Sequence, residues 1–175
     1  MENYKKNLEL LTKNHVYSKE MEHDACGVGV IASTEGKKSR AVVEYGIEAL
    51  KAVWHRGAVD ADGKTGDGAG IHVEIPKDFF IEKIEVTGHD YDNSEICVGM
   101  IFLPRNDYSS QESCKTIVES ELTKNNFSIY GWRQVPVNPK ILGEKAFQTM
   151  PEIIQVLFKP NDKSLLDKNL ERKIY

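Results

Sequence analysis

The order of apolar and polar residues in the first half of the chain predicts two strands. Residues 26–33, CGVGVIAS, begin with a glycine-rich stretch, continue with β-branched side chains and precede a turn at Glu35-Gly36. A short apolar run bounded by turn residues is typical of a buried strand. Residues 71–75, IHVEI, alternate apolar and polar side chains before Pro76, and this alternation predicts the second strand.

A helix is predicted between these strands, over residues 39–55. Ser39 is of a type that caps helix N-termini, and Gly57 is of a type that ends helices. The apolar positions between them recur at helical spacing. Those positions are Val42, Val43, Ile47, Leu50, Val53 and Trp54. The next segment, residues 56–70, holds five glycines and three aspartates and is typical of a long polar loop.

The second half of the chain predicts three more strands and one more helix. The strands are expected at residues 96–103, 127–135 and 153–158, each close to a proline that interrupts ladder hydrogen bonds. The helix, capped near Ser109 or Ser110, is expected to have one apolar face. That face would hold Cys114, Ile117, Val118 and Leu122. Strands and helices in this order indicate an α+β fold or an αββα layered fold.

The two ends of the chain differ from the segments between them. Residues 163–175 begin another helical pattern that stops at Tyr175 without a cap, so we expect the fold to be incomplete at its C-terminus. Residues 1–25 are polar and charged and look like an appendage to the fold. They contain lysines but no continuous apolar run, so they do not form a secretory signal, and a cytoplasmic location is expected.

The composition excludes two classes of partner. Of the 175 residues, 40% are apolar and 29% are charged, as in one soluble globular domain. No apolar run reaches the roughly 18 residues that are needed to cross a bilayer, so no membrane span is expected. The net charge of −4, with scattered basic residues, gives no general attraction for phosphate backbones. Nucleic acid is therefore not an expected partner.

The three cysteines, Cys26, Cys97 and Cys114, are widely spaced and form no C-x-x-C pair. This spacing argues against a disulfide framework and against a zinc site. The five histidines show no H-x-x-x-H spacing, so no metal site is predicted. Cys97 and Cys114 belong to apolar faces, and we expect both in the core.

Cys26 stands between the polar leader and the first predicted strand, and two interpretations of it stay open. A cysteine beside a strand is commonly a small buried hydrophobic residue. If residues 1–25 were removed, however, the new α-amino group, with a pKa of about 7.7–8.0, could take the proton of its own thiol. Cys26 would then be a nucleophile that needs no histidine base.

Arg56 also has two interpretations. At the end of the predicted helix a cation complements the helix dipole, so Arg56 is either an ordinary C-terminal charge or part of a site. His55 beside it offers a base by type, but a single histidine at a helix end is usually a surface or capping residue.

The glycine-rich loop matches none of three cofactor motifs. A phosphate loop that ends in the Gly-Lys-Thr of residues 63–65 would need glycine in place of Ala58. A calcium loop from Asp60 would need glutamate in place of Ile71. The G-x-G of residues 27–29 lacks the third glycine of a dinucleotide site.

Four stretches of the sequence closely resemble one family. They are DACGVGVIAS, VVEYGIEALKAVWHRGAVDADGKTGDGAGIHVEIP, YGWRQVPVNPKILGEKA and MPEIIQVLF. Over residues 24–175 the chain is similar to the glutamine amidotransferase domain of bacterial glutamate synthase large subunits, a class II, N-terminal-nucleophile domain. The resemblance implies that residues 26–175 are the N-terminal part of this αββα domain and that residues 1–25 are a leader peptide.

The resemblance also implies a chemistry. Cleavage between Ala25 and Cys26 would expose Cys26 as the nucleophile that attacks L-glutamine, forms a γ-glutamyl thioester and releases ammonia for 2-oxoglutarate. Arg56 matches the arginine of the family's H-R-G motif, which helps to order the surroundings of the nucleophile, and Asp67 and Gly68 match a stretch near that site. The resemblance implies FMN, an iron–sulfur cluster, the rest of the large subunit and a small subunit for the full-length enzyme, with no cofactor in this chain.

Two family motifs do not occur in the 175 residues: the H-x-R-[YW]-[ST] arginine that binds the α-carboxylate of glutamine, and the Asn-Gly pair of the oxyanion hole. Removing one oxyanion donor typically costs about 10²–10³ in rate, so little activity is expected from this chain alone. The preferred hypothesis is a fragment of a glutaminase domain within a longer polypeptide. The alternative is a non-catalytic, truncated amidotransferase-like module that acts by binding.

Overall fold

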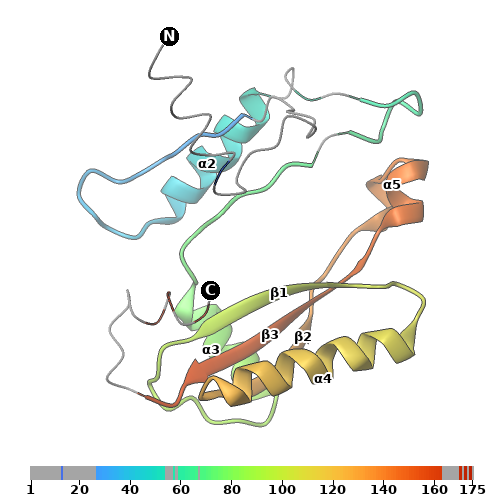
Figure 1. Ribbon diagram of the computed structural model, residues 1–175. Coiled ribbons are helices and arrows are strands. Elements are labelled where there is room, and N and C mark those ends of the chain that lie inside the picture. The colour runs from blue at the N-terminus through green and yellow to red at the C-terminus, as the bar shows by residue number, and fades with distance from the viewer. Residues whose placement is uncertain are drawn as a thin grey trace. The chain divides into compact units, whose positions relative to one another are not determined.

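The chain divides into two compact units, Met1–Arg56 and Gly57–Tyr175, and each is described by itself. In the first unit the structure describes helix α2. In the second unit it describes a three-stranded sheet together with several helices (Figure 1). No helix within the described residues is long and apolar enough to cross a membrane. The computed structural model describes residues 13, 27–53, 57, 59–66, 68–162, 170, 172 and 174.

Helix α2 (Arg40–Ala52) begins where the sequence predicts. The hydroxyl of Ser39 accepts a hydrogen bond from the Ala41 amide at 3.1 Å, which gives a partner to an amide that the helix itself leaves unpaired. The predicted cap is therefore confirmed. The helix ends at Ala52 with Val53 as its C-cap, a little before the predicted end at residue 55.

The turn that precedes α2 is confirmed as well. The amide of Gly36 donates to the carbonyl oxygen of Ser33 at 3.2 Å. Gly36 has a φ of 65°, in the left-handed region that glycine enters without steric cost. A residue with a side chain would be strained there.

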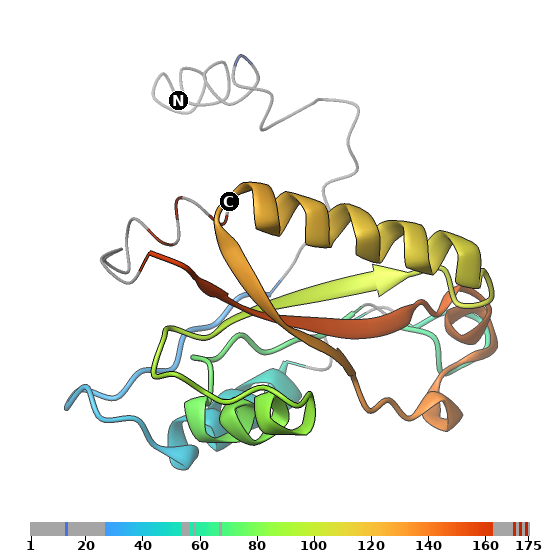
Figure 2. The ribbon, with the colours of Figure 1, turned by 90° about the horizontal axis from the view of Figure 1, so that it is seen from below.

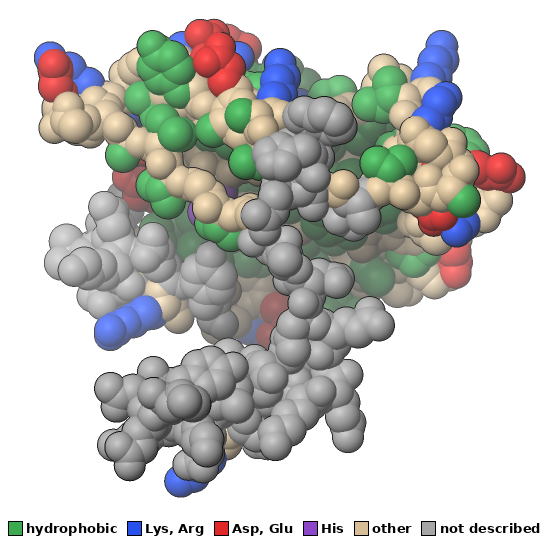
Figure 3. Space-filling model, turned by 90° about the horizontal axis from the view of Figure 1, so that it is seen from above, with side chains coloured by type: hydrophobic (Ala, Val, Ile, Leu, Met, Phe, Trp, Pro, Cys, Tyr) green, Lys and Arg blue, Asp and Glu red, His purple; other side chains and the backbone are tan. Residues whose placement is uncertain are grey.

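The two strands predicted for the first half of the chain do not form within the described residues. Residues 27–33 and 71–75 have no regular secondary structure. A strand persists when a neighbouring strand pairs its amides and carbonyls, and no described segment pairs with either stretch. Val28 and Val30 consequently stay 91% and 86% exposed. Figure 3 shows hydrophobic side chains, in green, at the surface of one face of the molecule.

The three strands predicted for the second half are confirmed and form one antiparallel sheet. They are β1 (Cys97–Leu103), β2 (Phe127–Gln134) and β3 (Glu152–Pro160), in the order β1-β3-β2. The last strand in the chain therefore lies in the centre, with Cys97 opposite Phe158 on one side and Phe127 opposite Pro160 on the other.

Helices α3 (Lys77–Val86) and α4 (Tyr108–Lys124) cover opposite faces of this sheet (Figure 2). Neighbouring residues of a strand point to opposite faces, and β3 shows this directly at Val156 and Leu157. Leu157 belongs to the α3 cluster, whose buried members are Phe80, Ile84, Ile96, Tyr130 and Leu157. Val156 belongs to the α4 cluster, whose buried members are Cys97, Phe127, Val156, Phe158 and Leu170.

Helix α4 corrects two details of the sequence prediction. Its N-cap is Asp107, whose carboxylate accepts from the Ser110 amide at 3.0 Å, and not Ser109 or Ser110. Ile117 is 62% exposed, whereas Val118 packs against the α4 cluster. Successive helical residues are 100° apart, so these two neighbours cannot both face the sheet squarely.

Helix α3 differs from the sequence prediction, in which Pro76 only ends a strand. A proline followed by an acidic residue, here Asp78, is also a helix start signal. Phe80 and Ile84 then lie four residues apart on one face, and both are buried. The α+β class is confirmed, and the four-layer αββα arrangement stays a prediction.

Two short helices follow β2, namely a 3-10 helix at Pro139–Ile141 and α5 at Glu144–Thr149. The helix predicted for residues 163–175 lies mostly outside the described residues. Leu170, Arg172 and Ile174 are described and are helical, and Leu170 is buried in the α4 cluster.

Candidate active site

Three of the four residues that the sequence assigns to the site lie outside the described residues. They are Cys26, Arg56 and Asp67. The fourth, Gly68, is exposed, and a Cβ atom added to it would meet no other atom within 4 Å. We therefore describe the segments next to these positions: the segment after Cys26, helix α2 before Arg56, and the loop before Asp67.

The segment that follows Cys26 is exposed and carries small residues at its start. A Cβ atom added to Gly27 or Gly29 would also meet nothing within 4 Å. Helix α2, which leads toward Arg56, keeps Lys51 in its last turn, where a cation complements the helix dipole. Lys51 is therefore a cation that complements the dipole at the C-terminal end of α2, which is one of the two interpretations of Arg56.

The loop that leads to Asp67 folds back on itself between Val59 and Gly66, which form an isolated antiparallel bridge. The Asp60 amide donates to the carbonyl of Thr65 at 2.7 Å, and the Gly63 amide donates to the carbonyl of Asp60 at 2.9 Å. Gly63 has a φ of 68°, so the tight turn needs glycine there. The turn from Val59 to Gly66 therefore has a defined conformation.

Asp62 holds the inside of this turn. Its Oδ1 accepts from the amides of Lys64 at 2.9 Å and Thr65 at 2.7 Å, and the Thr65 hydroxyl donates to its Oδ2 at 2.5 Å. These hydrogen bonds favour the charged carboxylate, and the Thr65 hydroxyl contributes most. They hold the pKa of Asp62 well below its usual range.

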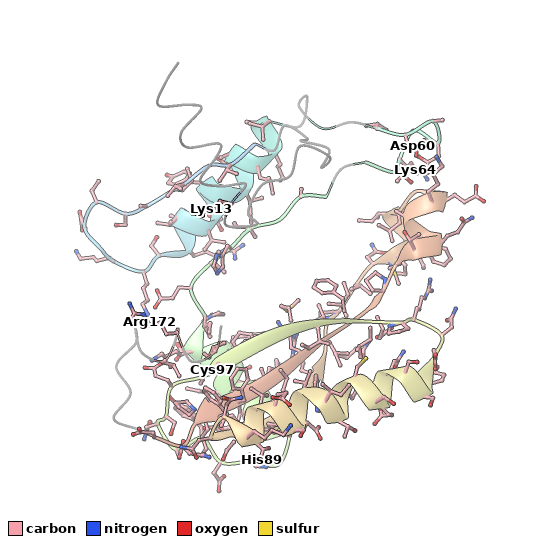
Figure 4. The ribbon with its side chains drawn as sticks, in the orientation of Figure 1. Lys13, Asp60, Lys64, His89, Cys97 and Arg172 are labelled. Carbon is pink, nitrogen blue, oxygen red and sulfur yellow. The ribbon has the colours of Figure 1, made fainter. Side chains whose placement is uncertain are left out.

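The turn also lies beside α5, as the labelled Asp60 and Lys64 show in Figure 4. Lys145 Nζ lies 2.7 Å from Asp60 Oδ2, and the Ala146 amide donates to the Thr65 hydroxyl at 3.5 Å, the outer limit for such a bond. Loop and helix are more than eighty residues apart in sequence. No pattern in the sequence predicts this contact, because the two segments are far apart along the chain.

The geometry of this turn differs from that of a phosphate loop and of a calcium loop. A phosphate loop leads directly into a helix, whereas residues 63–65 lie in a turn that returns to a bridge at Gly66. The carboxylates that a calcium loop would use are occupied otherwise: Asp60 pairs with Lys145, and Asp62 accepts the amides of its own turn. Within the described part of the chain, no three His, Cys, Asp or Glu side chains form a potential metal site.

Of the two described cysteines, Cys97 differs from what a nucleophile requires. Cys97 is 5% exposed in the α4 cluster, in agreement with the predicted core position. Burial, together with the nearby Glu95 carboxylate, raises the pKa of Cys97 to about 11, so its thiol stays protonated at neutral pH. Figure 4 shows Cys97 on the sheet, apart from the Asp60 turn. Cys114 is half-buried on α4.

The family of the chain is decided by a match that begins at the candidate nucleophile. Residues 26–175 match the model of the class-II glutamine amidotransferases. The chain belongs to this family. The resemblance deduced from the sequence motifs is thereby confirmed.

Curated relatives of this amidotransferase chain are named glutamate synthases. It is 54% identical over 172 residues to the glutamate synthase [NADPH] large chain of Azospirillum brasilense, and this covers 98% of the chain. It is 41% identical over 155 residues to ferredoxin-dependent glutamate synthase 1 of Arabidopsis thaliana, and 38% identical over 154 residues to the glutamate synthase [NADH] of Saccharomyces cerevisiae, covering 88% and 85% of the chain. The matched regions are 11%, 9% and 7% of the lengths of these three relatives.

Proposed function

We propose that this chain supplies the nucleophile-bearing part of a glutaminase domain in a glutamate synthase. The observation that carries the proposal is the family match, which starts at Cys26 and leaves residues 1–25 unmatched. A leader of 25 residues that is removed before Cys26 would give the chain an N-terminal cysteine. Residues 1–25 are accordingly proposed as a propeptide and residues 26–175 as the N-terminal part of the domain.

The chemistry follows from an N-terminal cysteine. Its α-amino group has a pKa of about 7.7–8.0 and takes the thiol proton near neutral pH. The sulfur attacks the side-chain carboxamide carbon of L-glutamine, a C–S bond forms, and the C–N bond breaks as the nitrogen leaves with a proton as ammonia. Water then cleaves the γ-glutamyl thioester, which yields glutamate and restores the thiol.

The other proposed site residues support this step. Arg56 orders the surroundings of Cys26, and Asp67 and Gly68 belong to a stretch near that site. The high pKa of Cys97 supports the choice of Cys26, because a buried, protonated thiol is a poor nucleophile. Ammonia reacts with 2-oxoglutarate at a distant synthase site in the rest of the large subunit, with a small subunit as a further partner, in the cytoplasm.

FMN and an iron–sulfur cluster are proposed for the longer enzyme and not for these residues. Iron–sulfur clusters are generally held by four cysteine thiolates, whereas this chain has three cysteines. One of them, Cys97, is enclosed in a hydrophobic cluster. These residues do not fit such a cluster, and no step of the glutaminase chemistry involves it.

The test uses the longer polypeptide to which we propose the chain belongs. Cys26→Ser should abolish glutamine-dependent synthesis of glutamate and spare synthesis from added ammonia. Cys114→Ser is the matched control, because Cys114 is a half-buried thiol on α4, and this variant should keep both activities. Equal loss of both activities in Cys26→Ser would contradict the nucleophile assignment.

Two further measurements test the leader and the isolated chain. Intact mass should show that the mature protein begins at Cys26. A retained Met1 would mean that the catalytic amine does not exist. The 175-residue chain alone should show no measurable glutaminase, since it has no Asn-Gly pair for an oxyanion hole. Robust hydrolysis of glutamine by this chain would refute the second expectation.

A further inference from the structure

The turn at residues 60–65 and the start of α5 are packed together at one glycine. Gly143 is buried, and it directly precedes α5. A Cβ atom built on it would come within 2.5 Å of the Thr65 backbone nitrogen and still closer to the Thr65 hydroxyl and the Asp62 carboxylate. Real Cβ atoms do not come this close to non-bonded atoms, so a larger residue at position 143 must shift the turn and α5 relative to each other.

Polar contacts surround this packed glycine. The amide of Glu144, the first residue of α5, donates to the Asp62 carboxylate. Lys145 Nζ lies 2.7 Å from Asp60 Oδ2, and the Ala146 amide lies 3.5 Å from the Thr65 hydroxyl. Three consecutive residues of α5 therefore contact the turn, each through a different partner. We call the contacts of Asp60, Asp62 and Thr65 with residues 143–146 the loop clamp.

The loop clamp connects residues 60–65 to the start of α5, and neither segment belongs to the three-stranded sheet. Residues 59–70 contain no buried side chain among those described, so apolar packing alone would not hold this loop in one conformation. The segment around Gly143 is tied to the sheet in two ways. Only Pro151 separates Met150, the C-cap of α5, from β3, and the guanidinium carbon of Arg105 lies 4.5 Å from the ring centroid of Phe147 in α5. The clamp thus transfers the rigidity of the sheet to the loop.

We propose that the loop clamp positions the Asp67–Gly68 stretch for glutamine turnover, so that Thr65 and Gly143 are positioning residues of the glutaminase site. This inference rests on the proposed function, which assigns Asp67 and Gly68 to the neighbourhood of Cys26. Gly66, which is bridged to Val59, directly follows the clamped Thr65 and directly precedes Asp67. We therefore expect a shift of the turn to reach Gly68, which follows Gly66 by two positions.

The first part of the test measures the clamp itself, in the 175-residue chain, by amide hydrogen exchange of a peptide that spans residues 59–68. Gly143→Ala should raise exchange in this peptide, because the turn is displaced. Gly99→Ala is the matched control: its added Cβ would meet Val156 Cγ1 at 2.8 Å inside the sheet, far along the chain from the turn. Unchanged exchange in Gly143→Ala, or an equal rise in both variants, overturns the clamp.

The second part measures positioning in the longer polypeptide, through the ratio of glutamine-dependent to ammonia-dependent synthesis. A displacement of about 1 Å can cost on the order of 10²-fold in rate, so Gly143→Ala should lower kcat/KM for glutamine by about tenfold to a hundredfold. Ammonia-dependent turnover should stay within about twofold, since the rate is then set at another site. Gly99→Ala should leave the ratio unchanged.

Thr65 separates positioning from general stability. Thr65→Val keeps the shape of the side chain but removes the hydroxyl that donates to Asp62, so it should lower the ratio of glutamine-dependent to ammonia-dependent synthesis. Thr65→Ser keeps the hydroxyl and should retain the ratio of the parent. If Thr65→Val and Gly143→Ala behave like the parent, the positioning role is overturned. Cys26→Ser, measured in parallel, distinguishes the two hypotheses: glutamine turnover that survives this substitution refutes the proposed function, and normal clamp variants beside an inactive Cys26→Ser refute only the inference.

Discussion

Leu157, at the centre of β3, provides the sharpest test of the fold. Its side chain has no exposed surface, and it packs in the α3 cluster with Ile84 and Tyr130. Full burial of a leucine side chain contributes about 1.5–3 kcal/mol. Leu157→Ala removes most of that contribution and leaves a cavity between strand and helix, so the free energy of unfolding should fall by about 2–5 kcal/mol.

Urea unfolding of the 175-residue chain, followed by tryptophan fluorescence, measures this loss. With a slope of about 1–3 kcal/mol per molar urea, the midpoint should fall by about 1–2 M while the slope stays the same. Ile117→Ala is the matched control, because it truncates a β-branched residue that is 62% exposed on α4 and should change stability by no more than about 0.5 kcal/mol. Equal shifts in the two variants would refute the placement of Leu157 in the core.

Three further predictions concern single side chains. Ser39→Ala should lower the helix content of α2, measured by amide exchange across residues 40–52, and cost about 0.5–2 kcal/mol, whereas Ser39→Gly should cost only a few tenths. Cys97 should resist alkylation at pH 8 until the chain unfolds, because its pKa of about 11 leaves only about one thiol in a thousand ionised, and fast labelling in a native peptide map would contradict its burial. The pKa of Asp92 is lowered from its ordinary 3.8, chiefly by Lys159, so its stabilising effect is complete above about pH 4 and is lost as the pH falls through the lower folded value. Asp92→Asn should therefore flatten the acid side of the stability profile, and an unchanged profile would remove Asp92 from this role.

Local patterns predicted some elements well because the forces involved are local. The Ser39 cap and the turn at Gly36 depend on residues within three positions of one another, and both were found from residue types alone. The strands β1, β2 and β3 were also found, since each is a β-branched or aromatic run near a proline. What the patterns could not supply was the order of the strands in the sheet, with the last one in the centre.

The failures have a common physical cause. The stretches 27–33 and 71–75 have the composition of strands, but a strand exists only with a partner, and none pairs with them in the part of the chain that the structure describes. Ile117 fits the helical spacing of the apolar residues of α4, but its side chain is exposed. The apolar pattern of one helix or strand does not predict which other segment packs against it or pairs with it.

The candidate site divides in the same way. The sequence by itself determined the family, the candidate nucleophile and the rejection of phosphate and calcium motifs, because motif identity and spacing are properties of the chain. A signal for the turn was also present, since an aspartate followed three residues later by threonine, as at Asp62 and Thr65, favours a turn in which the side chain binds backbone amides. The contact of that turn with Gly143 was decided only by the tertiary structure, because the long chain between Thr65 and Gly143 must fold before the two surfaces meet.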